Sequence, residues 1–244
     1  MSDPRIAVVA KRLSGIRRVL AFSSAKGGVG KTMCTVISAL ALARGGRHVG
    51  VLDLDMQGAS AHLFLGVTPR LPEEKQGILP LPVVDRVTLM SVAAFTGERG
   101  LPLRGAEISD AILELLAVTI WGPAELLLID MPPGMGEEIL DLSRLVPRLE
   151  ALVVSTPAVV SVTVVERLLS VLKELRVPVP AVVANMVQAD SRPVRDLARR
   201  AGVARVVEVP QDPLLESAVG APDALAASAA GRSLAKGMLE LGYL

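Results

Sequence analysis

The residues best suited to chemistry form the segment AKGGVGKT at positions 25–32, which follows a short apolar run. Its three glycines let the backbone curl so that N–H groups point inward, where they can bind phosphate oxygens. Lys31 can then reach the β- and γ-phosphates of a nucleotide, and the hydroxyl of Thr32 can bind Mg²⁺. A helix that begins here adds the positive end of its dipole. The predicted nucleotide-binding segment comprises Lys26, Gly27, Gly28, Val29, Gly30, Lys31, Thr32 and Met33.

Two further apolar runs end in aspartate. VGVLDLD places Asp53 at the end of one run and Asp55 two residues later, and ELLLID ends in Asp130. The carboxyl ends of parallel strands form the edge of a sheet at which ligands bind. We therefore predict that Asp53 lies near the metal and that Asp130 holds Mg²⁺ through water. The alternative is that Asp53 or Asp55 only caps the helix that follows it.

The elements that must position these residues alternate along the chain. Apolar runs without polar alternation predict strands that are covered on both faces. The predicted strands are 19–23, 49–53, 87–92, 126–130, 151–155, 181–184 and 204–209, and the predicted helices are 31–44, 107–119, 137–146, 159–175 and 193–201. This alternation predicts a doubly wound, mostly parallel α/β sheet with helices on both faces. We expect one domain over residues 1–244, with an N-terminal extension at 1–17 and an irregular surface excursion at 66–86.

Composition narrows the class of protein. No stretch of eighteen residues lacks charged or turn residues, so a transmembrane helix is not expected. The N-terminal residues do not form a signal peptide, and the single cysteine, Cys34, excludes an intramolecular disulfide. These features predict a cytoplasmic protein. The formal net charge is +1 and the charges are interspersed, so neither nucleic acid nor a membrane is expected as a partner.

The loop also resembles a known family motif. KGGVGKT is similar to the deviant Walker A box of the ParA/MinD/Mrp superfamily of P-loop ATPases. The resemblance implies that Lys26 crosses a dimer interface and binds the phosphates held by the other subunit. It also implies a homodimer that hydrolyses ATP slowly, in which Asp55 is the switch aspartate that positions the attacking water.

The segment IDMPPGMGEE resembles the IDxPPGTGD motif of the Mrp branch, and the likeness extends from about position 19 to the final helix. The resemblance implies that Asn185 and the turn at 210–213, including Pro210 and Asp212, contact adenine. It further implies a link to iron–sulfur cluster assembly and a cluster-assembly or client protein as partner. The rigid Pro-Pro-Gly turn beside Asp130 is expected to act as a second switch.

Two departures from the branch bear on function. Members that carry a cluster have a C-x-x-C pair just after the segment that corresponds to Asn185, whereas ANMVQADSRP contains no cysteine. We therefore predict that this chain does not hold an iron–sulfur cluster. Met135 stands where the branch has threonine, which is expected to weaken the switch. The main alternative is a ParA- or MinD-like positioning ATPase; a small-molecule kinase has no evident substrate signature.

Overall fold

The computed structural model describes residues 3–96, 103, 105–134 and 136–244. In these ranges the chain forms one eight-stranded sheet with the strand order β3-β4-β2-β5-β1-β6-β7-β8. All neighbouring pairs are parallel except β3 with β4. The strands are β1 (Arg18–Ser23), β2 (Val49–Asp53), β3 (Leu81–Val84), β4 (Val87–Ser91), β5 (Leu126–Asp130), β6 (Leu149–Ser155), β7 (Ala181–Val187) and β8 (Val206–Pro210). The predicted fold class is confirmed.

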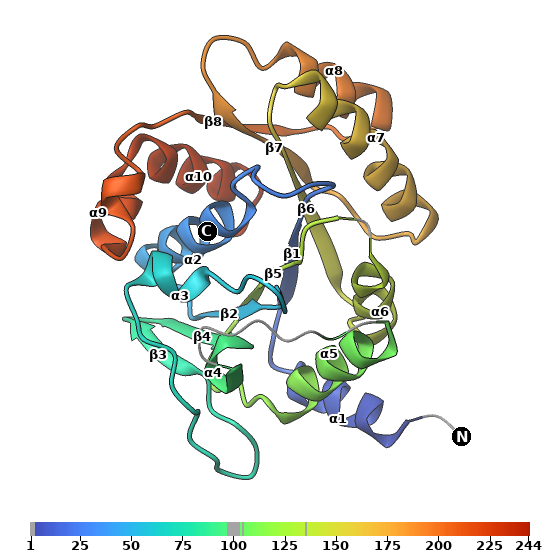
Figure 1. Cartoon of the computed structure of the whole chain (residues 1–244), viewed down its shortest axis with the longest axis vertical. Coiled ribbons are helices and arrows are strands. Elements are labelled where there is room, and N and C mark those ends of the chain that lie inside the picture. The colour runs from blue at the N-terminus through green and yellow to red at the C-terminus, as the bar shows by residue number, and fades with distance from the viewer. Residues whose placement is uncertain (1–2, 97–102, 104, 135) are drawn as a thin grey trace.

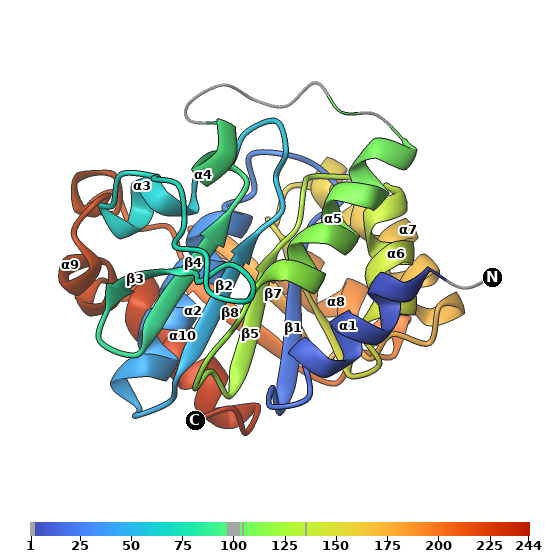
Figure 2. The ribbon, with the colours of Figure 1, turned by 90° about the horizontal axis from the view of Figure 1, so that it is seen from below.

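Helices cover both faces of this sheet (Figures 1 and 2). One layer contains α2 (Lys31–Arg44), α3 (Ala61–Leu65), α9 (Pro222–Ala227) and α10 (Ala229–Glu240). The other contains α1 (Pro4–Arg12), α5 (Ala106–Val118), α6 (Glu137–Leu145), α7 (Val159–Glu174) and α8 (Arg192–Ala201). Two short helices, α4 (Ala93–Thr96) and the 3₁₀ turn η1 (Glu216–Ala218), complete the described elements.

Each face of the sheet has its own hydrophobic core. Successive side chains of a strand point to opposite faces. In β1, Val19 and Ala21 therefore belong to the core beneath α1 and α5, while Leu20 and Phe22 belong to the core beneath α2 and α10. This double burial explains why the strands are apolar throughout.

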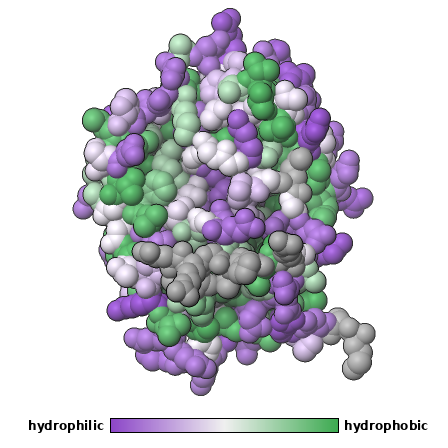
Figure 3. All heavy atoms as spheres, viewed as in Figure 1, coloured by the Kyte–Doolittle hydropathy of each residue, from purple (hydrophilic) through white to green (hydrophobic). Residues whose placement is uncertain are grey.

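On the face seen in Figure 3, hydrophilic and hydrophobic side chains are interspersed outside the grey residues.

Several predicted elements match the structure in their bounds, and others were not predicted. The helix 31–44 and the strands 49–53 and 126–130 are confirmed residue for residue. The segment 66–86, expected to be irregular, contains the antiparallel edge strand β3. The segment 1–17, treated as an extension, contains α1, which packs against α5 and buries Val9 completely.

The last described helix packs against the body of the domain. Helix α10 lies on α2 and β8, and Tyr243 after it donates a hydrogen bond to Glu150 of β6. The guanidinium of Arg18 lies 4.4 Å from the centroid of the Tyr243 ring and also binds Glu150. Within the described residues, no helix has the length and apolar character needed to cross a membrane.

Candidate functional site

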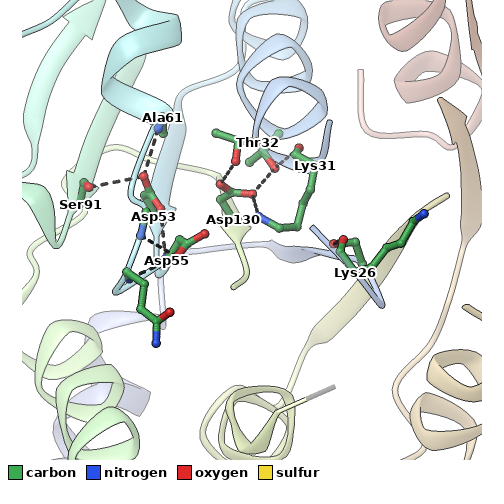
Figure 4. A network of polar contacts seen from close by, with 12 residues as sticks. Lys26, Lys31, Thr32, Asp53, Asp55, Ala61, Ser91 and Asp130 are labelled. Carbon is green, nitrogen blue, oxygen red and sulfur yellow. Dashed lines mark hydrogen bonds and ion pairs between the residues drawn. The ribbon is translucent and has the colours of Figure 1, made fainter. Parts of the chain in front are cut away.

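The predicted site residues meet because the strands that carry them are neighbours. Strand β5 lies between β2 and β1, so the loop after β1 and the aspartates of β2 and β5 share one edge of the sheet. Asp53 and Asp130 are direct register partners across the β2–β5 pair. Figure 4 shows Lys31, Thr32, Asp53, Asp55 and Asp130 gathered there.

The loop between β1 and α2 surrounds a cavity of ≈ 240 Å³. Besides the predicted segment 26–33, the cavity is lined by Ser24, Asp55, Ser60, Phe64 and Pro133. Gly30 has a φ of +79°, and a Cβ atom on it would lie 2.3 Å from Nδ2 of Asn185. Both facts require glycine at this position. A curled loop with this opening at a helix N-terminus is suited to phosphate groups.

Lys31, which lines the cavity, forms a buried ion pair with Asp130. Nζ of Lys31 lies 2.6 Å from Oδ1 of Asp130, and the two side chains are 7 % and 0 % exposed. The hydroxyl of Thr32 donates to Oδ2 of Asp130 at 2.6 Å, and that of Thr35 lies 3.2 Å from Oδ1. Burial raises the pKa of Asp130, and the neighbouring ammonium and hydroxyl groups oppose that rise. The ammonium of Lys31, 2.6 Å away, stabilises the ionised form of the carboxylate.

Asp53 is a second buried carboxylate beside this pair. Its oxygens accept hydrogen bonds from the backbone N–H of Asp55 at 3.2 Å and of Ala61 at 3.1 Å. The hydroxyl of Ser91 lies 3.5 Å away. Burial, and then the charge of Asp130, raise the pKa of Asp53 to about 7. Ser60 occupies the N-cap position of α3 without a side-chain cap hydrogen bond, and Asp53 accepts the N–H of the first helical residue, Ala61.

Asp55 and Lys26 lie at the mouth of the cavity. Oδ1 of Asp55 accepts from the backbone N–H of Gln57 at 3.3 Å and of Gly58 at 2.9 Å, and the carboxylate lines the cavity. The Lys26 side chain is half-buried and points away from Lys31 and Asp130 (Figure 4). In the part of the chain that the structure describes, the ammonium of Lys26 has no carboxylate within ion-pair distance.

The residues expected to bind adenine differ in the hydrogen bonds that they already make within the chain. Asn185 is 1 % exposed, and its Nδ2 donates to the carbonyl oxygen of Val29 at 2.8 Å. Its Oδ1 is buried and has no hydrogen-bond partner among the described residues. Asp212 accepts from the backbone N–H groups of Leu214 and Ala229, both at 3.0 Å. Asp212 thereby shapes the loop after β8, whose last residue is Pro210. The unpartnered Oδ1 of Asn185 is the atom that has capacity to accept from a ligand.

The turn after β5 is tied directly to the phosphate loop. The N–H of Gly134, which has a φ of +112°, donates to the carbonyl of Ser24 at 2.9 Å. A Cβ atom on Gly27 would lie 3.9 Å from Cβ of Pro133. A movement of the turn at 132–134 would therefore shift the phosphate loop directly, through these two contacts. The expected weakening at Met135 lies outside the described residues.

Cys34 lies in α2 and is fully buried, and burial raises the pKa of its thiol. Among the residues that the structure places, no group of three or more His, Cys, Asp or Glu is arranged to hold a metal ion. The sequence did not predict the contact of Thr35 with Asp130 or the unpartnered Oδ1 of Asn185. Thr35 could have been found, because it follows Lys31 by four residues and so lies on the same helix face.

Comparison with known proteins places these features in context. Residues 15–235 match the ParA family model described as NUBPL iron-transfer P-loop NTPase. The iron–sulfur cluster carrier protein of Mycobacterium tuberculosis (strain ATCC 25618 / H37Rv) is 39 % identical over 172 residues, covering 70 % of this chain and 45 % of that protein. The protein of the same name from Methanocaldococcus jannaschii is 36 % identical over 184 residues, covering 74 % and 63 %. The chain thus spans about half the length of these relatives.

Solved structures agree on the architecture. The nucleotide-binding protein of Archaeoglobus fulgidus in complex with ADP has a TM-score of 0.77 and 26 % identity, covering 90 % of this chain and 92 % of that one. The cell division ATPase MinD of Pyrococcus furiosus has a TM-score of 0.69 at 22 % identity, covering 93 % and 100 %, which supports the fold alone.

Proposed function

Because this chain belongs to the ParA family, in the group described as NUBPL iron-transfer P-loop NTPases, we propose that it is an Mg²⁺-dependent ATPase switch of the Mrp type that serves iron–sulfur cluster assembly. The observation that carries the proposal is that Lys31 and Thr32 line one glycine-rich cavity and both contact the buried carboxylate of Asp130. These are the three residue types that a P-loop site needs for the terminal phosphates and the metal. The single, buried cysteine supports a cytoplasmic location.

The residues fit the ligands on independent grounds. Adenine carries an exocyclic N6 amino group, and the orphaned Oδ1 of Asn185 is a buried acceptor with no donor among the described residues. Thr32 and Asp130 supply a hydroxyl and a carboxylate 2.6 Å apart, which are ligands that Mg²⁺ takes directly or through water. Thr32 would hold Mg²⁺ directly and Asp130 through water, with Asp53 close to that water. When bound, Mg²⁺ would neutralise charge on the phosphates.

Different residues of the chain would bind the phosphates, orient the attacking water and transmit the switch. Lys31 leaves Asp130 and turns its ammonium into the cavity, where it binds the β- and γ-phosphates. Asp55 lines that cavity with its carboxylate and would orient the attacking water. The Pro-Pro-Gly turn, bonded to Ser24, would transmit the loss of the γ-phosphate to the loop.

Calorimetry tests the assignment of the phosphate loop. Lys31→Ala should abolish ATP binding, because Lys31 is the cation at the base of the cavity. Asp55→Ala should keep ATP affinity within a few-fold and lose turnover, because the carboxylate serves the water and not the phosphates. Unchanged ATP affinity in Lys31→Ala, with a normal melting temperature, would exclude this site.

A homodimer completes the proposal. The ammonium of Lys26 points away from its own Lys31 and Asp130, which supports a role at the phosphates of a second subunit (Figure 4). Mixing Lys26→Ala with Asp55→Ala subunits tests it, since one site of each mixed dimer combines an intact Asp55 with an intact Lys26 from its partner. Partial recovery of ATPase activity is expected. No recovery, once mixed dimers are shown to form, would contradict action between subunits.

We further propose that this chain does not itself hold a 4Fe–4S cluster and acts with a cluster-assembly or client protein. Residues 186–190 lack cysteine, and Cys34 is fully buried in α2. Anaerobic reconstitution with iron and sulfide should leave no brown, iron-containing dimer. A stable species with about four irons per dimer would overturn this part of the proposal.

The second candidate is a membrane-bound positioning ATPase. Its terminal anchor would have to be an amphipathic helix with an available apolar face. Helix α10 packs on α2 and β8 and buries Leu234 and Met238, so this helix does not offer these apolar side chains to a membrane. Sedimentation with anionic liposomes and ATP should leave the protein in the supernatant.

A further inference from the structure

The carboxylate of Asp130 is held by three side chains of one helix. Oδ1 receives Nζ of Lys31 at 2.6 Å and lies 3.2 Å from the hydroxyl of Thr35, while Oδ2 receives the hydroxyl of Thr32. All three donors come from the first turns of α2, at positions that share one helix face. The carboxylate is completely buried in the nucleotide-free protein, where these three donors hold it.

Two of these donors have other duties once a nucleotide is present. This inference rests on the proposed function, in which Lys31 moves to the phosphates and Thr32 to Mg²⁺. Asp130 would then keep one side-chain donor among the described residues, the hydroxyl of Thr35. We propose that Thr35 is a positioning residue, which holds the Asp130 carboxylate in place for the metal's water shell after Lys31 and Thr32 have left it.

The geometry of Thr35 suits such an exchange. Its hydroxyl lies 3.0 Å from the backbone carbonyl of Lys31 and 3.2 Å from Oδ1 of Asp130. One hydroxyl proton cannot serve both acceptors fully, and the ammonium of Lys31 already satisfies Oδ1 while the ion pair is closed. When Lys31 leaves, a rotation of the hydroxyl alone redirects the proton to the carboxylate. No heavy atom has to move, and the side chain is fully buried.

A purely structural role would look different. Threonine hydroxyls in helices commonly donate back to the carbonyl four residues earlier, as Thr35 does to Lys31. If that were its whole purpose, loss of the hydroxyl would change the stability of the nucleotide-free protein and leave metal dependence unchanged. If Thr35 positions Asp130, the Mg²⁺-dependent part of nucleotide binding must weaken selectively.

Thr35→Val keeps the shape of the side chain and removes the hydroxyl, and Thr35→Ser restores the hydroxyl. Ser38→Ala is the matched control, because Ser38 is buried on the same helix and its hydroxyl has no hydrogen-bond partner among the described residues. The probe is the non-hydrolysable analogue AMPPNP, titrated by calorimetry with excess EDTA and then over a series of MgCl₂ concentrations. Melting temperatures without nucleotide confirm folding, and Thr35→Ala replaces the valine variant if that variant does not fold.

Mg²⁺ is expected to raise the affinity for AMPPNP, and the Mg²⁺ concentration that gives half of this increase is the quantity compared. We expect Thr35→Val to raise that concentration by about 10-fold or more, the usual scale for a hydrogen bond to a buried charge. Affinity in EDTA should stay within about two-fold, and Thr35→Ser and Ser38→Ala should match the wild type. A wild-type Mg²⁺ dependence in folded Thr35→Val, or an equal loss in Thr35→Ser, would overturn the inference alone. Absence of AMPPNP binding in the wild type would overturn the proposed function and this inference together.

Discussion

Replacing Asp53 by asparagine removes a fully buried carboxylate while keeping its shape. The pKa of Asp53 is raised from 3.8 to about 7, first by burial and then by the charge of Asp130. The folded protein therefore holds a proton on Asp53 in a pH range where the unfolded chain has released it. Stability from this group is present below pH 3.8 and is lost as the pH rises through about 7.

The size of the effect follows from the shift. About three pKa units correspond to about 4 kcal/mol in total, of which about 2 to 3 kcal/mol is lost between roughly pH 5 and pH 8. The amide side chain of the variant would not titrate, so the stability of Asp53→Asn relative to the wild type should rise by that amount over the same interval. The amide also meets the backbone N–H groups of Asp55 and Ala61, which adds an offset that does not depend on pH.

The assay is urea unfolding of the nucleotide-free, Mg²⁺-free protein at several pH values, followed by far-UV circular dichroism. Thermal melts should show the same trend, with Asp53→Asn gaining roughly 4 to 12 °C on the wild type as the pH rises from about 5 to about 8. Asp55→Asn, which removes a half-buried carboxylate two residues away, is the matched control for loss of charge. A difference between Asp53→Asn and wild type that stays constant with pH would refute the burial argument.

Further substitutions probe the same site. Gly30→Ala should lower stability by about 2 to 4 kcal/mol in urea unfolding and weaken ATP binding, because φ is +79° and the new Cβ would meet Asn185. Asp130→Ala should cost about 3 to 5 kcal/mol by leaving Lys31 buried and unpaired, and the double variant Asp130→Ala with Lys31→Met should recover part of that loss. Asn185→Ala should reduce the preference for ATP over GTP by about 10-fold in competition binding, if its orphaned Oδ1 accepts from adenine. Equal melting curves or unchanged selectivity in these variants would contradict the corresponding contacts.

Part of the site could be predicted from the sequence. The phosphate loop and the three aspartates were predictable, because parallel strands with apolar sequences leave their polar residues at one edge. Asp53 and Asp130 are register partners for that reason, though sequence alone does not give the order of β2, β5 and β1. The coupling of Lys31 to Asp130 was not predicted, since it depends on side-chain packing between α2 and the end of β5.

Other parts were missed for local reasons. Strand β3 is short, contains Pro82 and lies at the edge, so its composition resembles that of a loop. The start of helix α1 could have been predicted, because Asp3 is an N-cap residue that accepts from the N–H of Arg5, and Pro4 follows Asp3. The segment was predicted as an extension, whereas the bonds from Arg5 to Asp110 and Glu114 fasten α1 to α5.

The burial of helix α2 has a kinetic consequence. Twelve of its fourteen residues are buried, and α10, α9 and α3 pack around it. The helix that carries the phosphate loop cannot tilt or slide without opening a core, so loading of the site has to proceed through rotation of side chains. Entry of a nucleotide then becomes a two-step event, an initial encounter at the loop followed by the exchange of Lys31 from carboxylate to phosphate. The observed association rate in stopped-flow experiments should therefore level off at high nucleotide concentration, at the rate with which the ion pair opens.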